Sequence, residues 1–238
     1  MAKPKTQSTT TTSSSAARVE APASERKLRL AQTGSTATRK PEPVPPADGS
    51  PWRPSKTQLL RARKKRVADL VRPGVKVLFC GINPGLYSAA VGHHFAGPGN
   101  LLWPTLFAAG FTPRLFTAFD ADELLGLGYG ITNFVPRATA AADELEPAEL
   151  RRGARRLTKL VLSLRPRWLV VLGLQAYRTG FERRKAAAGL QPETIGETRL
   201  WLLPNPSGLN AYHQPATLTR MFGELRAALQ ADGVVGDG

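Results

Sequence analysis

The sequence predicts a three-layer α/β/α sandwich around a short, mainly parallel sheet of four strands. Three observations lead to this fold class. A hydrophobic content of 42% is enough for a substantial core. Short apolar runs alternate along the chain with segments of helical periodicity, which is the order expected of a parallel sheet with crossover helices. The runs are mostly apolar rather than alternating, as in strands that are covered on both faces.

The two periodicities also predict where the elements lie. The four expected strands are Val75–Cys80, Gly130–Phe134, Trp168–Leu172 and Leu200–Leu203. The expected helices among and after them are Leu101–Ala109, Ala121–Gly126, Pro147–Leu164, Gln175–Ala188 and Ala216–Gln230. An earlier helix is expected between the N-cap Ser55 and the stop signal Arg72-Pro73-Gly74. Its apolar stripe is Leu59, Val67 and Leu70.

The chain divides into three expected parts. Residues 1–54 are rich in Ser, Thr and Pro, and their few large apolar side chains are Leu28, Leu30 and Trp52. Such a stretch cannot bury enough surface to offset its ordering entropy, so we expect a disordered basic arm. The arm either tethers DNA loosely or only solubilises the chain. Residues 55–232 form the expected catalytic domain, and residues 233–238 a flexible C-terminus.

The chain is strongly basic, with 33 Lys and Arg against 18 Asp and Glu and a formal net charge of +15. The arm carries nine positive and four negative side chains, which leaves a net charge of +10 for the rest. A basic folded part favours a polyanionic partner, and nucleic acid first among these. One basic cluster is consistent both with phosphate contacts and with a solvated helix face. Its members are Arg61, Arg63, Lys64, Lys65 and Arg66.

Composition and motifs exclude several kinds of site. The single cysteine, Cys80, rules out an intramolecular disulfide framework, a cysteine zinc module and a four-cysteine iron–sulfur site. The three histidines lack ligand spacing, so no metal is expected. Neither a G-x-G-x-x-G nor a P-loop pattern occurs, so no nucleotide cofactor is expected. No apolar run is long enough to span a membrane, and the N-terminus lacks the apolar region of a secretory signal.

Two Asn-Pro elbows follow expected strands. The first strand runs into Asn83-Pro84-Gly85, and the last runs into a segment with Asn205-Pro206-Ser207-Gly208-Leu209. Proline biases the residue before it away from the helical region, and glycine suits the third position of a type II turn. Ligands of open α/β sheets bind beyond the carboxyl ends of the strands, so the elbows predict a rigid Asn83 at the mouth of a site. Ordinary turn chemistry is the alternative interpretation.

Two apolar side chains near the elbows suggest contacts with bases. Residues 87–100 are expected to form a long functional loop, in which Phe95 either stacks on a flat base or anchors the loop in the core. Leu209 lies at the tip of the second elbow. It either inserts into a base stack as a wedge or packs back onto the last helix.

Taken together, these segments resemble the mismatch-specific uracil-DNA glycosylase family, the bacterial relatives of thymine-DNA glycosylase. The resemblance covers roughly Arg66 to Gln230, and its most specific part is the pair Gly-Ile-Asn-Pro-Gly and Asn-Pro-Ser-Gly-Leu. The matching residues, in the order of the family, are Phe79–Leu86, Phe95–Ala96, Pro98, Asn100–Trp103, Gly130–Thr132, Arg137, Thr139, Leu172–Gly173, Gln175–Tyr177 and Leu203–Leu209.

The resemblance implies a uracil-DNA glycosylase-like fold and a monofunctional enzyme. Such an enzyme flips uracil out of duplex DNA, preferentially from G·U mismatches, and hydrolyses its N-glycosidic bond to leave an abasic site. Other damaged pyrimidines are further candidate substrates. The implied partner is double-stranded DNA with a G·U mismatch, with no cofactor, metal or membrane. The implied state is a monomer in the bacterial cytoplasm, associated with the nucleoid.

The resemblance also implies roles for residues of the first elbow and of the pocket. Asn83 matches the catalytic asparagine that positions the attacking water. Phe95 matches the aromatic that stacks on the extruded base, and the backbone around Gly85 and Phe95 would hydrogen-bond the uracil edge. Ser88 matches a small pocket residue beside the pyrimidine C5 position. Asn133 stands in the pocket where well-studied bacterial members have lysine.

In the second elbow, the resemblance implies contacts with the duplex. Leu209 matches the wedge that fills the gap left by the base, and Asn205 and Ser207 belong to the same loop. The backbone near Gly208 and Asn210 would read the widowed guanine. This sequence departs from the pattern at Ala211, where the bacterial members have arginine. A second departure is His93-His94, which replaces a Phe-Pro pair.

The chemistry restricts how such an enzyme can work. A neutral carboxamide at Asn83 cannot act as a general base and can only orient a water. Neither elbow contains Asp, Glu or Lys, which disfavours both carboxylate assistance and a Schiff-base lyase step. Two alternatives stay open at this point. One is a non-catalytic nucleic-acid-binding α/β module, and the other is a hydrolase that uses Cys80 with His93 or His94.

Overall fold

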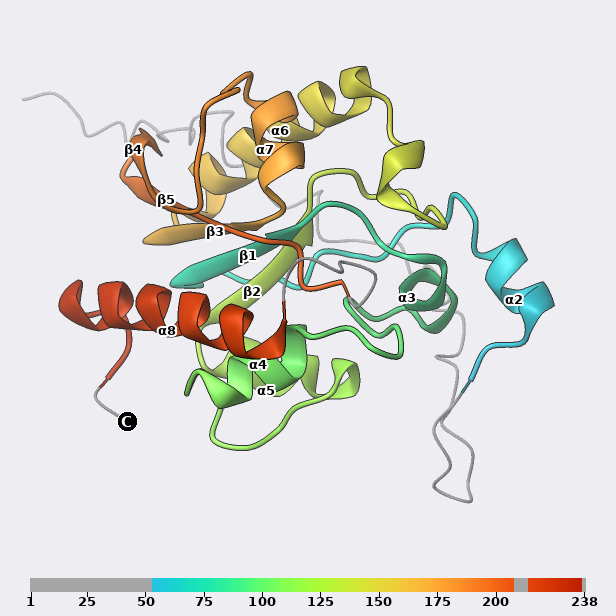
Figure 1. Ribbon diagram of the computed structural model, residues 1–238, viewed down its shortest axis with the longest axis horizontal. Coiled ribbons are helices and arrows are strands. Elements are labelled where there is room, and N and C mark those ends of the chain that lie inside the picture. Colours follow the sequence, from blue (N-terminus) through green and yellow to red (C-terminus); the bar gives the residue numbers. More distant parts are fainter. Residues whose placement is uncertain (1–52, 208–213, 237–238) are drawn as a thin grey trace, which may run out of the picture. The chain divides into compact units, whose positions relative to one another are not determined.

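Residues 53–207 and 214–236 of the computed structural model are described (Figure 1). The expected arm up to Trp52 lies outside the described residues. So do residues 208–213, which include Gly208, Leu209 and Asn210, and residues 237–238.

The core of the fold is a five-stranded, mainly parallel sheet with the order β2-β1-β3-β5-β4. Its strands are β1 Val77–Gly81, β2 Tyr129–Asn133, β3 Trp168–Leu172, β4 Gly189–Ile195 and β5 Thr198–Leu203. β4 pairs with β5 in the antiparallel direction, and the other neighbours are parallel. The four expected strands begin and end within two residues of their predicted bounds, and the α/β class is confirmed.

The fifth strand, β4, corrects the prediction of four. The side chains of β4 are only partly buried, and its sequence Gly-Leu-Gln-Pro-Glu-Thr-Ile contains Pro192. From the sequence alone, this composition indicates a loop. Proline lacks the N–H that a central strand needs, so it is confined to edges and irregular positions. β4 is an edge strand, and its pairing with β5 shifts register between Leu190 and Thr194, the interval that contains Pro192.

Helices cover both faces of the sheet, which completes the three layers (Figure 1). The helices are α2 Lys56–Arg61, α3 Leu86–Val91, α4 Leu102–Ala108, α5 Ala121–Gly126, α6 Pro147–Leu164, α7 Leu174–Gly180 and α8 Pro215–Ala231, with short 3-10 turns η1 Ala118–Asp120 and η2 Ala142–Glu144. α4, α5 and α8 lie on one face, and α6 and α7 lie on the other. Among the described residues, no helix combines the length and apolarity that a bilayer crossing requires.

Alternate side chains of each central strand enter two separate cores. Val77 and Phe79 of β1 pack with α4 and α8, whereas Leu78 and Cys80 pack with α6. These four side chains are fully buried. Burial on both faces explains why the strands consist of continuous apolar runs, as expected from the sequence.

The first helix is much shorter than predicted. α2 ends at Arg61, and Val67 and Leu70 lie on extended chain instead. Leu70 exchanges two backbone hydrogen bonds of 2.8 Å with Ile131 of β2. Lys64 adopts a left-handed φ of 67°, which stops any helix there. Like charges close together on one helix repel each other, so the run of basic residues also disfavours continuing it.

Two other predicted boundaries also differ. The expected loop 87–100 contains most of α3, which begins at Leu86 directly after the first elbow and ends at the left-handed Gly92. The expected helix Gln175–Ala188 ends at Gly180. A Cβ at Gly180 would lie 3.0 Å from the Leu150 carbonyl oxygen, so α7 and α6 are in close contact at that point.

Candidate active site

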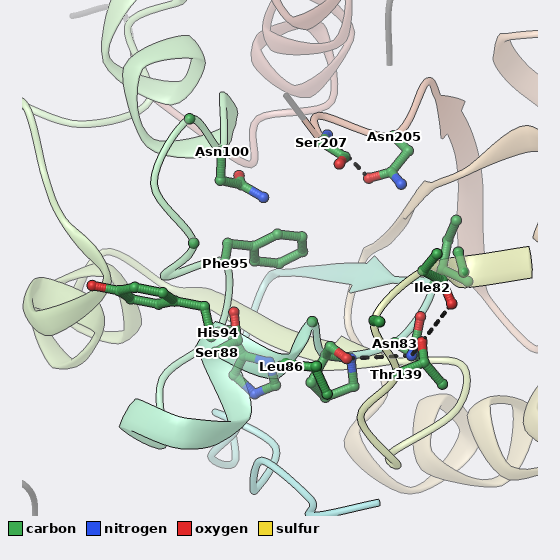
Figure 2. A pocket seen from close by; sticks show the side chains of 18 of the residues that line it. Ile82, Asn83, Leu86, Ser88, His94, Phe95, Asn100, Thr139, Asn205 and Ser207 are labelled. Carbon is green, nitrogen blue, oxygen red and sulfur yellow. Dashed lines mark hydrogen bonds between the residues drawn. The ribbon is translucent and has the colours of Figure 1, made fainter. Parts of the chain in front are cut away.

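Both elbows open onto one cavity at the carboxyl edge of the sheet (Figure 2). The two elbows meet there because β1 and β5 run in the same direction. The cavity has a volume of about 750 Å³. Seven of the ten predicted site residues line it, and the other three lie outside the described residues. The seven are Asn83, Gly85, Ser88, Phe95, Asn133, Asn205 and Ser207.

The side chain of Asn83 is held by its amide nitrogen. Nδ2 donates to the hydroxyl of Thr139 at 2.6 Å, to the Arg137 carbonyl oxygen at 3.2 Å and to the Pro84 carbonyl oxygen at 3.3 Å. The two carbonyls can only accept. The Thr139 hydroxyl donates its own proton to the Ala141 carbonyl at 2.7 Å, so toward Asn83 it can only accept.

This network fixes which way the Asn83 carboxamide faces. With three acceptors on one side, the amide nitrogen must lie there, and Oδ1 must lie on the other. No described residue donates a hydrogen bond to Oδ1. Asn83 is half-buried in the cavity wall, so its carbonyl oxygen is available as a rigid acceptor for a water or a ligand.

The loop that holds Asn83 is itself pinned by carboxylates. Arg137 forms a two-pronged ion pair with Glu149 of α6, at 2.6 Å from Nε and 2.8 Å from Nη2. The hydrogen bond from Arg137 lowers the pKa of Glu149 to about 2. Glu144 accepts the backbone N–H groups of Ala140 and Ala141. The position of Asn83 therefore depends on two ion-paired glutamates outside the cavity.

Thr139 and Arg137 are the contacts of Asn83 that sequence reasoning missed. They match the family pattern, but their contacts to Asn83 join positions more than fifty residues apart. The backbone bonds of Ala138 with Lys65 and of Thr139 with Pro84 add to the contacts of Glu144 and Glu149 in bringing the loop into place.

Phe95 lies across the middle of the cavity in a constrained backbone conformation (Figure 2). Its φ is 52°, and its carbonyl accepts from the Trp103 indole N–H at 3.2 Å. Its own N–H meets no acceptor among the described residues. The ring covers Gly81, where an added Cβ would lie 2.8 Å from a ring carbon. Glycine at the end of β1 is therefore what allows Phe95 to occupy this position.

Asn133, at the end of β2, is oriented by a buried histidine. His94 Nε2 lies 2.8 Å from the Ala68 carbonyl, which can only accept, so Nε2 carries the proton. Burial lowers the pKa of His94, which keeps the ring neutral. Its Nδ1 is then an acceptor and takes a hydrogen bond of 3.1 Å from Asn133 Nδ2. Asn133 Oδ1 is left without a hydrogen-bond donor among the described residues.

The remaining cavity residues are also tied to the fold. Ser88 Oγ accepts from the Ala96 N–H at 3.1 Å, which fixes the segment before Gly97. In the second elbow, Asn205 Oδ1 accepts from the Ser207 N–H at 3.2 Å. The Pro206 carbonyl accepts from Leu101 at 2.8 Å, which links this elbow to the start of α4.

Charged side chains and an accessible thiol are not found in the described part of the cavity lining. None of the described residues that line the cavity is an Asp, Glu, Lys or Arg. Cys80 is fully buried, its pKa is raised by burial, and its thiol contacts the Gly81 carbonyl. His94 cannot serve as its base, since both ring nitrogens are engaged. Across residues 53–207 and 214–236, no three His, Cys, Asp or Glu side chains gather as metal ligands would.

A comparison with protein families gives a match for this domain. The family model described as the uracil DNA glycosylase superfamily matches residues 68–230. The matched range is more than half of the chain and contains the complete sheet, both elbows and all the described cavity residues except Leu59.

Proposed function

Since the chain belongs to the uracil-DNA glycosylase superfamily, we propose that it is a monofunctional enzyme that removes uracil from double-stranded DNA, preferentially from G·U mismatches. It hydrolyses the N-glycosidic bond and leaves an abasic site. The observation that carries this proposal is the Asn83 carboxamide in the cavity wall, whose nitrogen is fixed by three acceptors and whose oxygen accepts from no described residue.

The proposed reaction begins with a base that has left the helix. Extrusion costs roughly a few kcal/mol and is easier for a weak pair, which favours G·U over A·U before any contact with the pocket. The uracil ring stacks on Phe95. Asn133 Oδ1 is an acceptor and therefore suits the N3–H of uracil, whereas the unprotonated N3 of cytosine would repel it.

Bond cleavage then proceeds with a water held by Asn83 Oδ1. The water oxygen bonds to the sugar C1′ as the bond from C1′ to the base N1 breaks, and the electron pair leaves with uracil as its anion. The proton of the water passes to solvent. The N–H groups of Gly85 and Phe95 have no partner among the described residues and are proposed to donate to the uracil oxygens. In other enzymes, losing one such donor costs about 3–4 kcal/mol.

Contacts with the rest of the duplex complete the proposal. Leu209 is proposed as the wedge, and Gly208 and Asn210 as the residues that read the opposite guanine; all three lie outside the described ranges. The protein acts as a monomer and without metal. A net charge of +10 beyond residue 54 suits a DNA partner in the bacterial cytoplasm, at the nucleoid.

The test is excision from a labelled G·U duplex, followed by alkaline cleavage of abasic sites. Strand breaks are expected with the native protein in the presence of a chelator and are expected to disappear with Asn83→Ala. Cys80→Ala is the control, because it removes the only thiol and leaves the proposed site intact. Salt-sensitive DNA binding without strand breaks would instead support the non-catalytic module and overturn the proposal.

A further inference from the structure

The segment Lys56–Arg66, here called the basic segment, precedes the residues matched by the family model. It comprises α2 and the turn after it, and it contains no acidic residue. Its six cationic side chains are all exposed. They are Lys56, Arg61, Arg63, Lys64, Lys65 and Arg66.

The basic segment is fixed to the domain by its backbone and by small apolar side chains. The Lys64 N–H donates to the Ala138 carbonyl at 3.1 Å, and the Ala138 N–H donates to the Lys65 carbonyl at 2.8 Å. Ala62 is fully buried and packs with Val67, Ala89 and Ala138. The cations therefore project from a rigid support. Ala138 also lies between Arg137 and Thr139, which hold Asn83.

The basic segment borders the candidate active site. Leu59 of α2 lines the cavity, and α2 lies beside α3, which begins at the first elbow (Figure 1). Leu60, next to Leu59, is 69% exposed. The apolar pair Leu59-Leu60 therefore lies at the cavity on the same short segment as the six cations.

Within the described part of the chain, little negative charge compensates the basic segment. Among partners in residues 53–207 and 214–236, one ion pair of the basic segment is found, between Arg63 and Glu144 at 2.7 Å. The other five cations make no ion pair with any described residue. By contrast, Arg137 and Arg156 next to the cavity are both paired with carboxylates. A rigid group of like charges repels itself, so it is best explained by an anionic partner.

We propose that the basic segment binds the phosphate backbone of duplex DNA beside the extruded nucleotide, independently of sequence. The inference rests on the proposed function for the identity of the partner. A base in the cavity remains attached to its sugar and to the flanking phosphates, so its own strand must cross the cavity rim. Cations at that rim meet those phosphates, and Leu60 meets the sugars between them. Such contacts position a protein on DNA without reading bases.

The test compares the salt dependence of binding for two triple variants of the full chain. The first, Arg61→Gln/Lys64→Gln/Lys65→Gln, removes three cations from the basic segment. The control, Arg72→Gln/Lys76→Gln/Lys159→Gln, removes three exposed cations from the opposite side of the domain. Arg72 and Lys76 precede β1, and Lys159 lies in the half of α6 that leads to β3.

Binding is measured by fluorescence anisotropy with a labelled duplex that contains no uracil. The slope of log K against log salt is negative, and it becomes shallower by about 0.9 for each phosphate that the protein no longer neutralises. For the basic-segment triple we therefore expect it to become shallower by about 2.7. If the two affinities converge at 1 M salt, this change of slope corresponds at 0.15 M to a loss of affinity of about 170-fold. The control triple is expected to change the slope by less than the value for a single phosphate. Lys65→Gln alone is expected to reduce it by about 0.9.

Two outcomes overturn the inference: an unchanged slope in the basic-segment triple, or equal losses in the two triples, which would show a general effect of net charge. Melting temperatures identify a variant that fails to fold, and Lys65→Gln then carries the test. Single-turnover excision of uracil is assayed separately at saturating protein. Absence of excision by the native chain would refute the proposed function and leave the binding comparison interpretable.

Discussion

The hydroxyl of Thr139 is expected to determine how well Asn83 positions its water. Thr139→Val keeps the shape of this buried side chain but removes the shortest of the three contacts to Asn83 Nδ2, at 2.6 Å. It also deprives the Ala141 carbonyl of its donor. One hydrogen bond contributes about 1 kcal/mol net, and leaving the half-buried Asn83 Nδ2 without its shortest contact costs about 1–3 kcal/mol at most. If Asn83 is oriented less well as a result, the lost free energy raises the activation barrier, and each 1.36 kcal/mol lowers the rate about tenfold.

We therefore expect Thr139→Val to slow excision about 10- to 100-fold. The assay is single-turnover excision from a G·U duplex at saturating protein, with the affinity for uracil-free duplex measured in parallel. Affinity should be unchanged, because the Thr139 side chain is almost fully buried. Thr139→Ser retains the hydroxyl and is expected to restore most of the rate. Native excision by Thr139→Val, with the Val substitution verified by mass, would refute the role given to this hydrogen bond.

Three further predictions follow from other parts of the site. Gly81→Ala places a Cβ 2.5 Å from Asn133 Oδ1 and 2.8 Å from the Phe95 ring. It should therefore displace Phe95 and lower the free energy of unfolding by about 1–3 kcal/mol. An unchanged melting temperature would contradict this. The pKa of Glu149 is lowered from 4.5 to about 2, so its stabilising effect is complete above pH 4.5 and is lost as the pH falls toward 2. Glu149→Gln should remove that part of the acid dependence of unfolding, and identical acid profiles would exclude it. Leu209→Ala should impair excision from duplex more than from single-stranded DNA, since only a duplex has a gap to fill; equal losses would oppose the wedge assignment.

The sequence was sufficient for the parts of the fold that are set by local periodicity. The strand runs at Val77, Trp168 and Leu200 are apolar because both faces of the sheet are covered, and this signal is visible without a structure. The first elbow was equally predictable, because Asn83-Pro84-Gly85 constrains the backbone at that point. These two signals together predicted which edge of the sheet holds the cavity.

Features that depend on distant contacts could not be predicted in this way. β4 is polar and contains Pro192, and it is a strand only because β5 offers it an edge. Val67 and Leu70 show apparent helical spacing, yet Leu70 pairs with Ile131 of β2. Thr139 acquires its role from a loop that the ion pair of Arg137 and Glu149 holds in place. In each of these cases a partner far along the chain determines the outcome.

The direction of the hydrogen bonds around Asn83 has an evolutionary consequence. An aspartate at this position would direct a carboxylate oxygen toward the carbonyls of Pro84 and Arg137, neither of which can donate a proton. Asn83→Asp alone should therefore displace the side chain from its contacts with these carbonyls or leave the carboxyl protonated. Neither result adds a competent base. A descendant that adopts carboxylate chemistry here must first rebuild the 135–141 loop. Asn83 is thus part of a mutually dependent group, and a single substitution at this position does not supply a competent base.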